Sequence, residues 1–276
     1  MKTPGNTRAQ PPETLEGWYA LHQIFTRDHS SVRTFDDTRG DGATVQPPEP
    51  TKRNSEGWTA WARLIGSRAD LMAMHFAPTL DDIAELEAAI KRSPALDALR
   101  MTFSFLSVTE AGLYHLTAEL ARETVERGGT VGDEAYAEEL AKRVAKERGN
   151  SHVQRRLFPT VPEGMPYVCF YPMSKRRAPE QNWYAQSIDE RSRLMQAHGR
   201  TGRRYAGKVV QIITGSIGFE TWEWGVTLFA ADPLDLKKLV TDMRFDEVSA
   251  NYADFGDFYV GKLAPGADLA ALVETL

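Results

Sequence analysis

The sequence predicts an α+β fold in which two ferredoxin-like β-α-β-β-α-β units pack sheet to sheet as a dimeric α+β barrel. Its 276 residues suffice for one large domain or two fused ones. Apolar runs and helix-start signals in the second half follow the order of that unit. The first half shows the same strands and the same second helix, and this repetition is typical of a duplicated unit.

The N-terminal unit is expected at 15–160, after a flexible polar arm at 1–14. A run rich in aromatic and aliphatic residues predicts its first strand at 17–26. The segment 28–56 is polar and is broken by glycines and prolines. We therefore expect a long loop where the unit should carry its first helix.

Two strands at 57–65 and 69–77 are predicted to form a hairpin that turns at Gly66. Thr79 can cap a helix that runs to about residue 92, and Asp81 in its first turn is favourable. The rest of this half is predicted as a strand at 101–109 and two extra, charged helices within 110–148, at 110–127 and 133–147.

The C-terminal unit is expected at 161–276, and this half is predicted to contain most of the residues that contact a bound ligand. Ser187 and Glu190 form a capping-box signature for a helix that should end at Gly199. Asp232 followed by a proline predicts the start of the second helix, which should reach about residue 243. The strands of this half are predicted at 165–172, 208–214, 221–230 and 251–259.

Composition narrows the class of protein. With 42% hydrophobic residues the chain can bury a sizeable core, and a net charge of −5 argues against a general nucleic-acid binder. Cys169 is the single cysteine, so neither an intramolecular disulfide nor a cysteine-based zinc site can form. We expect a cytoplasmic protein, because the sequence shows neither a secretory signal nor an apolar run of about 20 residues.

The segment Tyr171-Pro-Met-Ser-Lys-Arg-Arg177 is the most informative stretch, because three cations directly follow an apolar run. Alternation along a strand would place Tyr171, Met173 and Lys175 on one face. They could then form the wall of a pocket for a large anionic ligand. The alternative is that the strand ends here and its cations are solvated. The spacing alone favours this alternative over a pocket wall.

His198 and Gln211 are candidate ligand contacts. His198 lies one turn after an apolar pair, and a neutral imidazole facing an apolar cavity is a good haem ligand. The more common alternative is a histidine that interacts with the dipole at a helix C-terminus. Gln211 lies in an apolar strand and, if buried, needs a hydrogen bond from the backbone or from a ligand.

Arginines stand beside apolar residues at Arg155, Arg156 and Arg244. Guanidinium groups commonly pair with carboxylates, and the acidic residues 246–247 are close to Arg244. Ser249 adds a hydroxyl in the same stretch. Neither a glycine-rich phosphate loop nor a Ser-His-Asp triad is indicated.

Several motifs together resemble the coproheme decarboxylases of the chlorite dismutase-like superfamily, densely over 153–262 and more loosely over 15–107. The motifs are Tyr171-Pro-Met-Ser-Lys-Arg-Arg177, Asn182-Trp-Tyr184, Leu194-Met-Gln-Ala-His-Gly199, Gln211-Ile-Ile-Thr-Gly-Ser216, Glu223-Trp-Gly-Val-Thr-Leu-Phe229 and Met243-Arg-Phe-Asp-Glu-Val-Ser-Ala250. The resemblance implies a homopentamer that binds Fe-coproporphyrin III (coproheme) as substrate and redox cofactor. It also implies transient contact with the ferrochelatase that delivers coproheme.

The implied reaction is a hydrogen-peroxide-dependent oxidative decarboxylation in haem biosynthesis. Propionates 2 and 4 become vinyl groups, and the products are haem b and CO2. By resemblance, Tyr171 is the catalytic phenol that becomes a tyrosyl radical, His198 is the iron ligand and Gln211 is the distal glutamine. The residues expected to contact propionates or to line the pocket beside them are Arg156, Met173, Lys175 and Ser249, with Arg244 nearby.

Two departures from the family pattern affect these expectations. The segment 28–56 lacks the apolar helix usual there, and one extra residue between Arg156 and Tyr171 leaves Arg155 open as the propionate contact. Other functions also remain open. A chlorite-degrading enzyme would carry a distal arginine at the position of Gln211. A haem carrier would not need the Tyr171 phenol. A barrel protein without cofactor would bind no coproheme.

Overall fold

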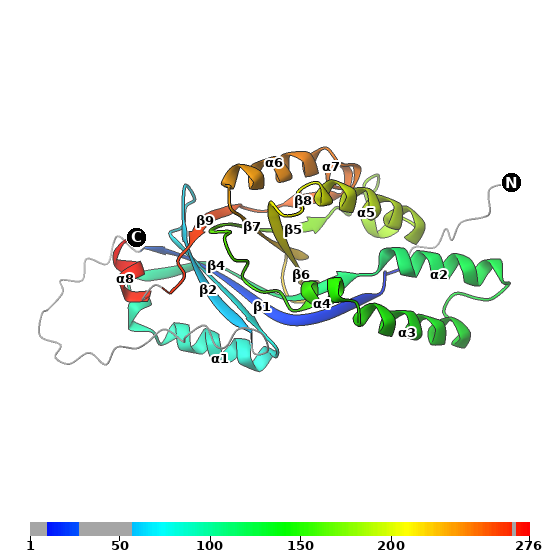
Figure 1. The fold of residues 1–276 in the computed structure, drawn as a ribbon, viewed down its shortest axis with the longest axis horizontal. Coiled ribbons are helices and arrows are strands. Elements are labelled where there is room, and N and C mark those ends of the chain that lie inside the picture. The colour runs from blue at the N-terminus through cyan, green and yellow to red at the C-terminus, as the bar shows by residue number, and fades with distance from the viewer. Residues whose placement is uncertain (1–9, 28–56, 267–268) are drawn as a thin grey trace, which may run out of the picture.

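The computed structural model describes residues 10–27, 57–266 and 269–276 (Figure 1). The predicted loop at 28–56 lies outside the described residues, as does most of the predicted arm at 1–14. The strands are β1 (Thr14–Arg27), β2 (Trp58–Leu64), β3 (Leu71–Ala77), β4 (Leu99–Gly112), β5 (Tyr167–Lys175), β6 (Val209–Gly215), β7 (Trp224–Ala230), β8 (Ala253–Phe255) and β9 (Tyr259–Leu263).

The α-helices are α1 (Leu80–Lys91), α2 (Tyr114–Glu126), α3 (Glu134–Arg148), α4 (Ser151–Leu157), α5 (Ile188–Arg203), α6 (Pro233–Arg244), α7 (Glu247–Tyr252) and α8 (Leu269–Glu274). Two 3-10 turns, η1 (Pro94–Leu96) and η2 (Trp183–Ala185), complete the described elements. Within the described part of the chain, no helix is both long enough and apolar enough to cross a membrane.

The strands form one large antiparallel sheet, so the predicted α+β class is confirmed. Their order is β7-β6-β4-β1-β3-β2-β9-β5-β8, and β7 also pairs with β5. The pairings therefore close into a ring, in which β4–β6 and β2–β9 join the two halves of the chain. Strand order is β4-β1-β3-β2 in the first half and β9-β5-β7-β6 in the second.

Strand alternation produces an inner core and outer layers covered by helices. The inner core combines Ile24 and Met74 of the first half with Phe170, Ile212 and Phe229 of the second. Outside the ring, α1 packs on β1 and β3, whereas α6 packs on β5 and β7. Figure 1 shows α5, α6 and α7 together at the top of the view and α1 at the bottom.

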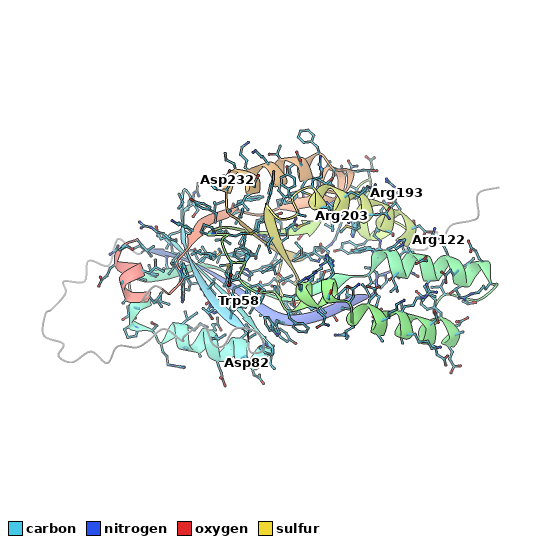
Figure 2. The ribbon with its side chains drawn as sticks, in the orientation of Figure 1. Trp58, Asp82, Arg122, Arg193, Arg203 and Asp232 are labelled. Atoms are coloured by element: carbon cyan, nitrogen blue, oxygen red, sulfur yellow. The ribbon has the colours of Figure 1, made fainter. Side chains whose placement is uncertain are left out.

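Local capping signals located several helices correctly. Thr79 and Asp82 form a reciprocal capping box at the start of α1, and Asp232 accepts a 2.9 Å hydrogen bond from the backbone N–H of Leu234 in α6. Asp82 and Asp232 are labelled in Figure 2. Gly66, at φ +71°, occupies the turn of the predicted β2–β3 hairpin.

Some predicted boundaries were wrong. Glu110 pairs with Glu16 at the end of β4, so α2 begins at Tyr114 rather than at residue 110. Tertiary pairing overrode helix propensity there. The helix predicted to end at Gly199 continues to Arg203, since an internal glycine costs only about 1 kcal/mol. The strand predicted at 251–259 is divided among the end of α7, β8 and β9, and α4 and α8 were not predicted.

Candidate functional site

β5 carries two sets of side chains to two different layers. Phe170 packs in the inner core, whereas Cys169 and Tyr171 pack outward with Leu236 and Leu239 of α6. Met173 packs against this outer cluster. The strand continues to Lys175, so the alternation predicted for Tyr171, Met173 and Lys175 is present. The outer face of β5, beneath α5, α6 and α7, is therefore where the candidate site is built.

Tyr171 is buried in an aromatic group. Its ring stacks on Phe258, with centroids 4.4 Å apart and planes at 23°, and lies 5.9 Å from Phe255. Burial raises the pKa of the Tyr171 phenol, and the positive charge of Arg244 opposes this effect. The phenol is therefore protonated at neutral pH. A buried neutral phenol can lose a hydrogen atom, that is a proton and an electron together, without forming a charged phenolate in the buried site.

Arg244 does not pair with the neighbouring acidic residues as the sequence suggested. Its guanidinium carbon lies 3.8 Å from the ring centroid of Phe255. Asp246 is hydrogen-bonded to His198, and Glu247 pairs with Arg193 at 2.9 Å, which links α5 to α7. Arg193 is labelled in Figure 2. The aromatic ring is the preferred partner because a planar guanidinium stacks on aromatic faces.

His198 lies inside α5 rather than at its end, because the helix continues to Arg203. Its Nδ1 is 2.7 Å from Oδ2 of Asp246. A carboxylate only accepts, so Nδ1 holds the proton and a neutral ring keeps its lone pair on Nε2. A hydrogen bond of this kind fixes the tautomer that binds a metal and raises its basicity.

Asp246 joins His198 to a second predicted residue, Ser249. The carboxylate caps α7 by accepting the Ser249 backbone N–H at 2.9 Å, and the Ser249 hydroxyl lies 3.5 Å from its other oxygen. Burial alone would raise the pKa of Asp246, but the hydrogen bonds from His198 and Ser249 outweigh it and hold this pKa below its usual value. The carboxylate is therefore ionised at neutral pH and can support the imidazole.

Lys175 is held under an aromatic ring rather than solvated. Its ammonium lies 4.7 Å from the ring centroid of Trp183. Burial lowers the pKa of Lys175 to about 8, although the charges of Asp246 and Glu223 raise it. Among the described residues no carboxylate lies within 4 Å of this ammonium. A partly desolvated cation of this kind is suited to binding a carboxylate ligand.

Gln211 is exposed on β6, so it does not need the buried hydrogen-bond partner considered from the sequence. In the sheet register it lies opposite Leu228, which lies opposite Cys169 of β5. Two strand spacings therefore separate it from β5 by roughly 10 Å. A Cβ built on Gly202 would lie 3.5 Å from Nε2 of Gln211. The amide thus lies against α5, one turn after His198.

Arg156 lies on α4, and its positive charge affects the pKa of the Glu110 carboxyl. Burial raises the pKa of Glu110, whereas the Trp224 indole, which donates a 2.8 Å hydrogen bond, and the charge of Arg156 lower it. Trp224 lies opposite Met173 in the β5–β7 register. The charge of Arg156, and not that of Arg155, therefore lowers the pKa of a carboxyl whose hydrogen-bond partner pairs with Met173 of β5.

The sequence missed several partners of these residues. Glu223 is buried, accepts the Lys175 backbone N–H at 2.7 Å and pairs with Arg177. Arg176 pairs with Asp254 at 2.9 Å. The other two cations of the motif, Arg176 and Arg177, are thus occupied by ion pairs. Glu223 begins the motif Glu223-Trp-Gly-Val-Thr-Leu-Phe229, but no local pattern indicates its partners.

The outer face of β5 and the segments beside it thus offer one imidazole, one phenol, an ammonium and a hydroxyl, and Arg244 adds a guanidinium. Within the described ranges no group of three or more His, Cys, Asp or Glu side chains could hold a metal ion. A single imidazole such as that of His198 suits an iron atom whose other ligands come from a macrocycle. The cationic and hydroxyl donors suit carboxylates at the macrocycle edge.

Comparison with known proteins agrees with this chemistry. The family model described as chlorite dismutase matches residues 43–264. Coproheme decarboxylase of Staphylococcus saprophyticus is 38% identical over 269 residues, covering 95% of this chain and 98% of the relative. Relatives from Haloquadratum walsbyi and Haloarcula marismortui, whose names describe them as heme-binding proteins, are each 39% identical over 96% of this chain, but the chain covers only 48% and 38% of their length.

Solved structures show the same fold. A heme-binding protein from Thermus thermophilus matches with a TM-score of 0.73 and 34% identity, covering 97% of this chain and 99% of that protein. A mutant chlorite dismutase from Candidatus Nitrospira defluvii matches with a TM-score of 0.64 and 18% identity, covering 94% of this chain and 95% of that protein.

Proposed function

The chain belongs to the chlorite dismutase family, and on this premise we propose that it is a coproheme decarboxylase. The enzyme would use hydrogen peroxide to convert propionates 2 and 4 of Fe-coproporphyrin III into vinyl groups, giving haem b and CO2. One observation carries the proposal. His198, held by Asp246, belongs to the helical layer that covers the β5 face bearing Tyr171, Met173 and Lys175.

Each side chain then has a role that its surroundings support. Nε2 of His198 holds the substrate iron, and Asp246 maintains the tautomer that makes this possible. Lys175, Ser249 and Arg156 bind propionates. Met173 would pack beside the reacting group, and Gln211 would supply a neutral amide to the bound substrate.

The oxidation balances with one peroxide for each propionate. Loss of CO2, of the carboxyl proton and of one hydrogen from the neighbouring carbon is a two-electron oxidation, and hydrogen peroxide takes up both hydrogens and both electrons to become two waters. Tyr171, buried and neutral, would give its hydrogen atom toward the oxidant and then take one from the propionate chain, and the remaining electron would pass from that chain to the oxidant as CO2 leaves. Its stacking on Phe258 keeps water away from the resulting radical.

We also infer that 15–160 and 161–276 are two ferredoxin-like units of a dimeric α+β barrel. The equivalent orders β4-β1-β3-β2 and β9-β5-β7-β6 support this inference. From the resemblance we further infer a homopentamer in the cytoplasm that receives coproheme from a ferrochelatase through a transient contact.

The deciding experiment supplies purified protein with Fe-coproporphyrin III and hydrogen peroxide and follows porphyrin mass. We expect a three-propionate intermediate followed by haem b, with a loss of CO2 and two hydrogens at each step. A haem carrier would bind coproheme but leave its mass unchanged, which would falsify the proposal. Oxygen release from chlorite without decarboxylation would identify a chlorite-degrading enzyme instead.

Asp246→Asn should weaken the iron site while preserving the fold, because asparagine is an equally good helix cap. Its amide oxygen is a weaker acceptor for Nδ1, so His198 becomes a poorer donor to iron. We expect the iron reduction potential to rise and activity to fall by about 10–100-fold. Spectroelectrochemical titration and the mass assay measure both.

The control for this prediction is Asp242→Asn, which removes the same charge four residues earlier on α6. Asp242 accepts a 2.7 Å hydrogen bond from the Tyr205 hydroxyl and pairs with Arg204 at 3.3 Å, so its partners lie away from the His198 imidazole. We expect the potential of this variant to equal that of the parent. If both variants raise it equally, a general charge effect replaces the specific role of Asp246.

A further inference from the structure

Glu223 lies where the pairing of β5 with β7 ends. The last backbone pair joins Met173 to Trp224. Beyond it, the backbone N–H of Glu223 donates to the Met173 carbonyl at 3.0 Å, and the Lys175 N–H donates to Oε2 of Glu223 at 2.7 Å. The carboxylate thus replaces the backbone acceptor that β7 no longer supplies. This hydrogen bond fixes the position of the Lys175 backbone.

The same carboxylate is buried, with 4% of its side chain exposed, and its charge is compensated from two directions. On the outer side it pairs with Arg177, whose side chain is 67% exposed. The Arg177 guanidinium also lies 5.6 Å from the ring centroid of Tyr184. On its other side, its negative charge raises the pKa of Lys175. A buried carboxylate is retained only when such partners offset its desolvation.

We propose that Glu223 is a positioning residue for Lys175: it holds the end of β5 in register and keeps the ammonium charged for a substrate carboxylate. The identity of that carboxylate as a coproheme propionate rests on the proposed function. The coupling between Glu223 and Lys175 does not, and it can be tested without any porphyrin.

The groups that face Lys175 determine whether loss of the Glu223 charge raises or lowers the pKa of Lys175. These are the Glu223 carboxylate beside β5, the Asp246 carboxylate at the start of α7 and the neutral Trp183 ring of η2. Burial lowers the pKa of Lys175 to about 8, and both carboxylates raise it. Removing the charge of Glu223 therefore lowers the pKa further. Lys175 then loses its proton, and with it the ion pair to a carboxylate, at a lower pH.

The first experiment measures coproheme affinity against pH for the full chain and for Glu223→Gln, which keeps a hydrogen-bond acceptor but removes the charge. We expect the alkaline loss of affinity to begin at lower pH, with binding about tenfold weaker near pH 8. In a Lys175→Arg background the same change should leave the pH profile in place, because arginine does not titrate in this range.

Glu220→Gln is the matched control. Glu220 lies in the same β6–β7 connection, is exposed, and also accepts a backbone N–H, from Leu106 at 3.1 Å. Arg177→Gln provides a second variant with the opposite sign. Without the guanidinium, the negative charge of Glu223 acts on Lys175 unopposed, so the alkaline loss of affinity should move to higher pH.

The second experiment titrates Lys175 directly, without coproheme. The rate of its acetylation by a water-soluble amine reagent is followed against pH by peptide mass spectrometry. A lower midpoint in Glu223→Gln and a higher one in Arg177→Gln support the proposal even if the decarboxylase activity is absent. Midpoints in both variants equal to that of Glu220→Gln overturn it, whatever the enzyme does with coproheme.

Discussion

Tyr171→Phe is expected to bind coproheme as tightly as the parent and to leave all four propionates intact when peroxide is added. The substitution removes one oxygen from a ring that keeps its stacking on Phe258 and its place in the outer cluster. Phenylalanine cannot cycle between a phenol and a neutral radical. We expect decarboxylation to fall by at least about 1000-fold, measured by porphyrin mass after a fixed time.

Tyr167→Phe is the matched control, since Tyr167 lies on the same face of β5, four residues earlier, and contacts the same cluster. It should retain full turnover. Electron paramagnetic resonance after rapid freezing should show a tyrosyl radical in the parent and in Tyr167→Phe but none in Tyr171→Phe. Turnover retained in Tyr171→Phe would assign the oxidation to another group.

Elements with a local signal could be predicted from the sequence, and elements set by distant contacts could not. Gly66 turns the β2–β3 hairpin and Asp232 begins α6, as their own residue types dictate. By contrast, the end of α5 was placed at Gly199 although the helix continues to Arg203. A helix packed between neighbours tolerates an internal glycine because tertiary contacts outweigh the propensity cost.

The same division holds at the candidate site. Period-two alternation along one strand was enough to group Tyr171 with Met173. The hydrogen bond from His198 to Asp246 spans 48 positions, and so does the hydrogen bond from Lys175 to Glu223. Neither contact leaves a pattern in a single sequence, because only the folded sheet and its helical layer bring those segments together.

His198→Ala should separate the two roles that His198 could have, as iron ligand and as partner of Asp246. Removal of the imidazole takes away the nitrogen proposed to bind iron, so coproheme affinity should fall on the order of 100-fold and the Soret band should change. Asp246 still caps α7 through the Ser249 N–H, so the fold should persist. Absorption spectroscopy of coproheme titrations measures both quantities.

Added imidazole makes this prediction sharper. The variant leaves space where the ring stood, so millimolar imidazole should restore the parent Soret band in His198→Ala. A histidine needed only for its hydrogen bond to Asp246 would show neither the spectral change nor this rescue. His115→Ala, at an exposed position on α2, is the control and should keep the parent spectrum. An unchanged spectrum in His198→Ala would place the axial ligand elsewhere, and Asp246 would then serve α7 alone.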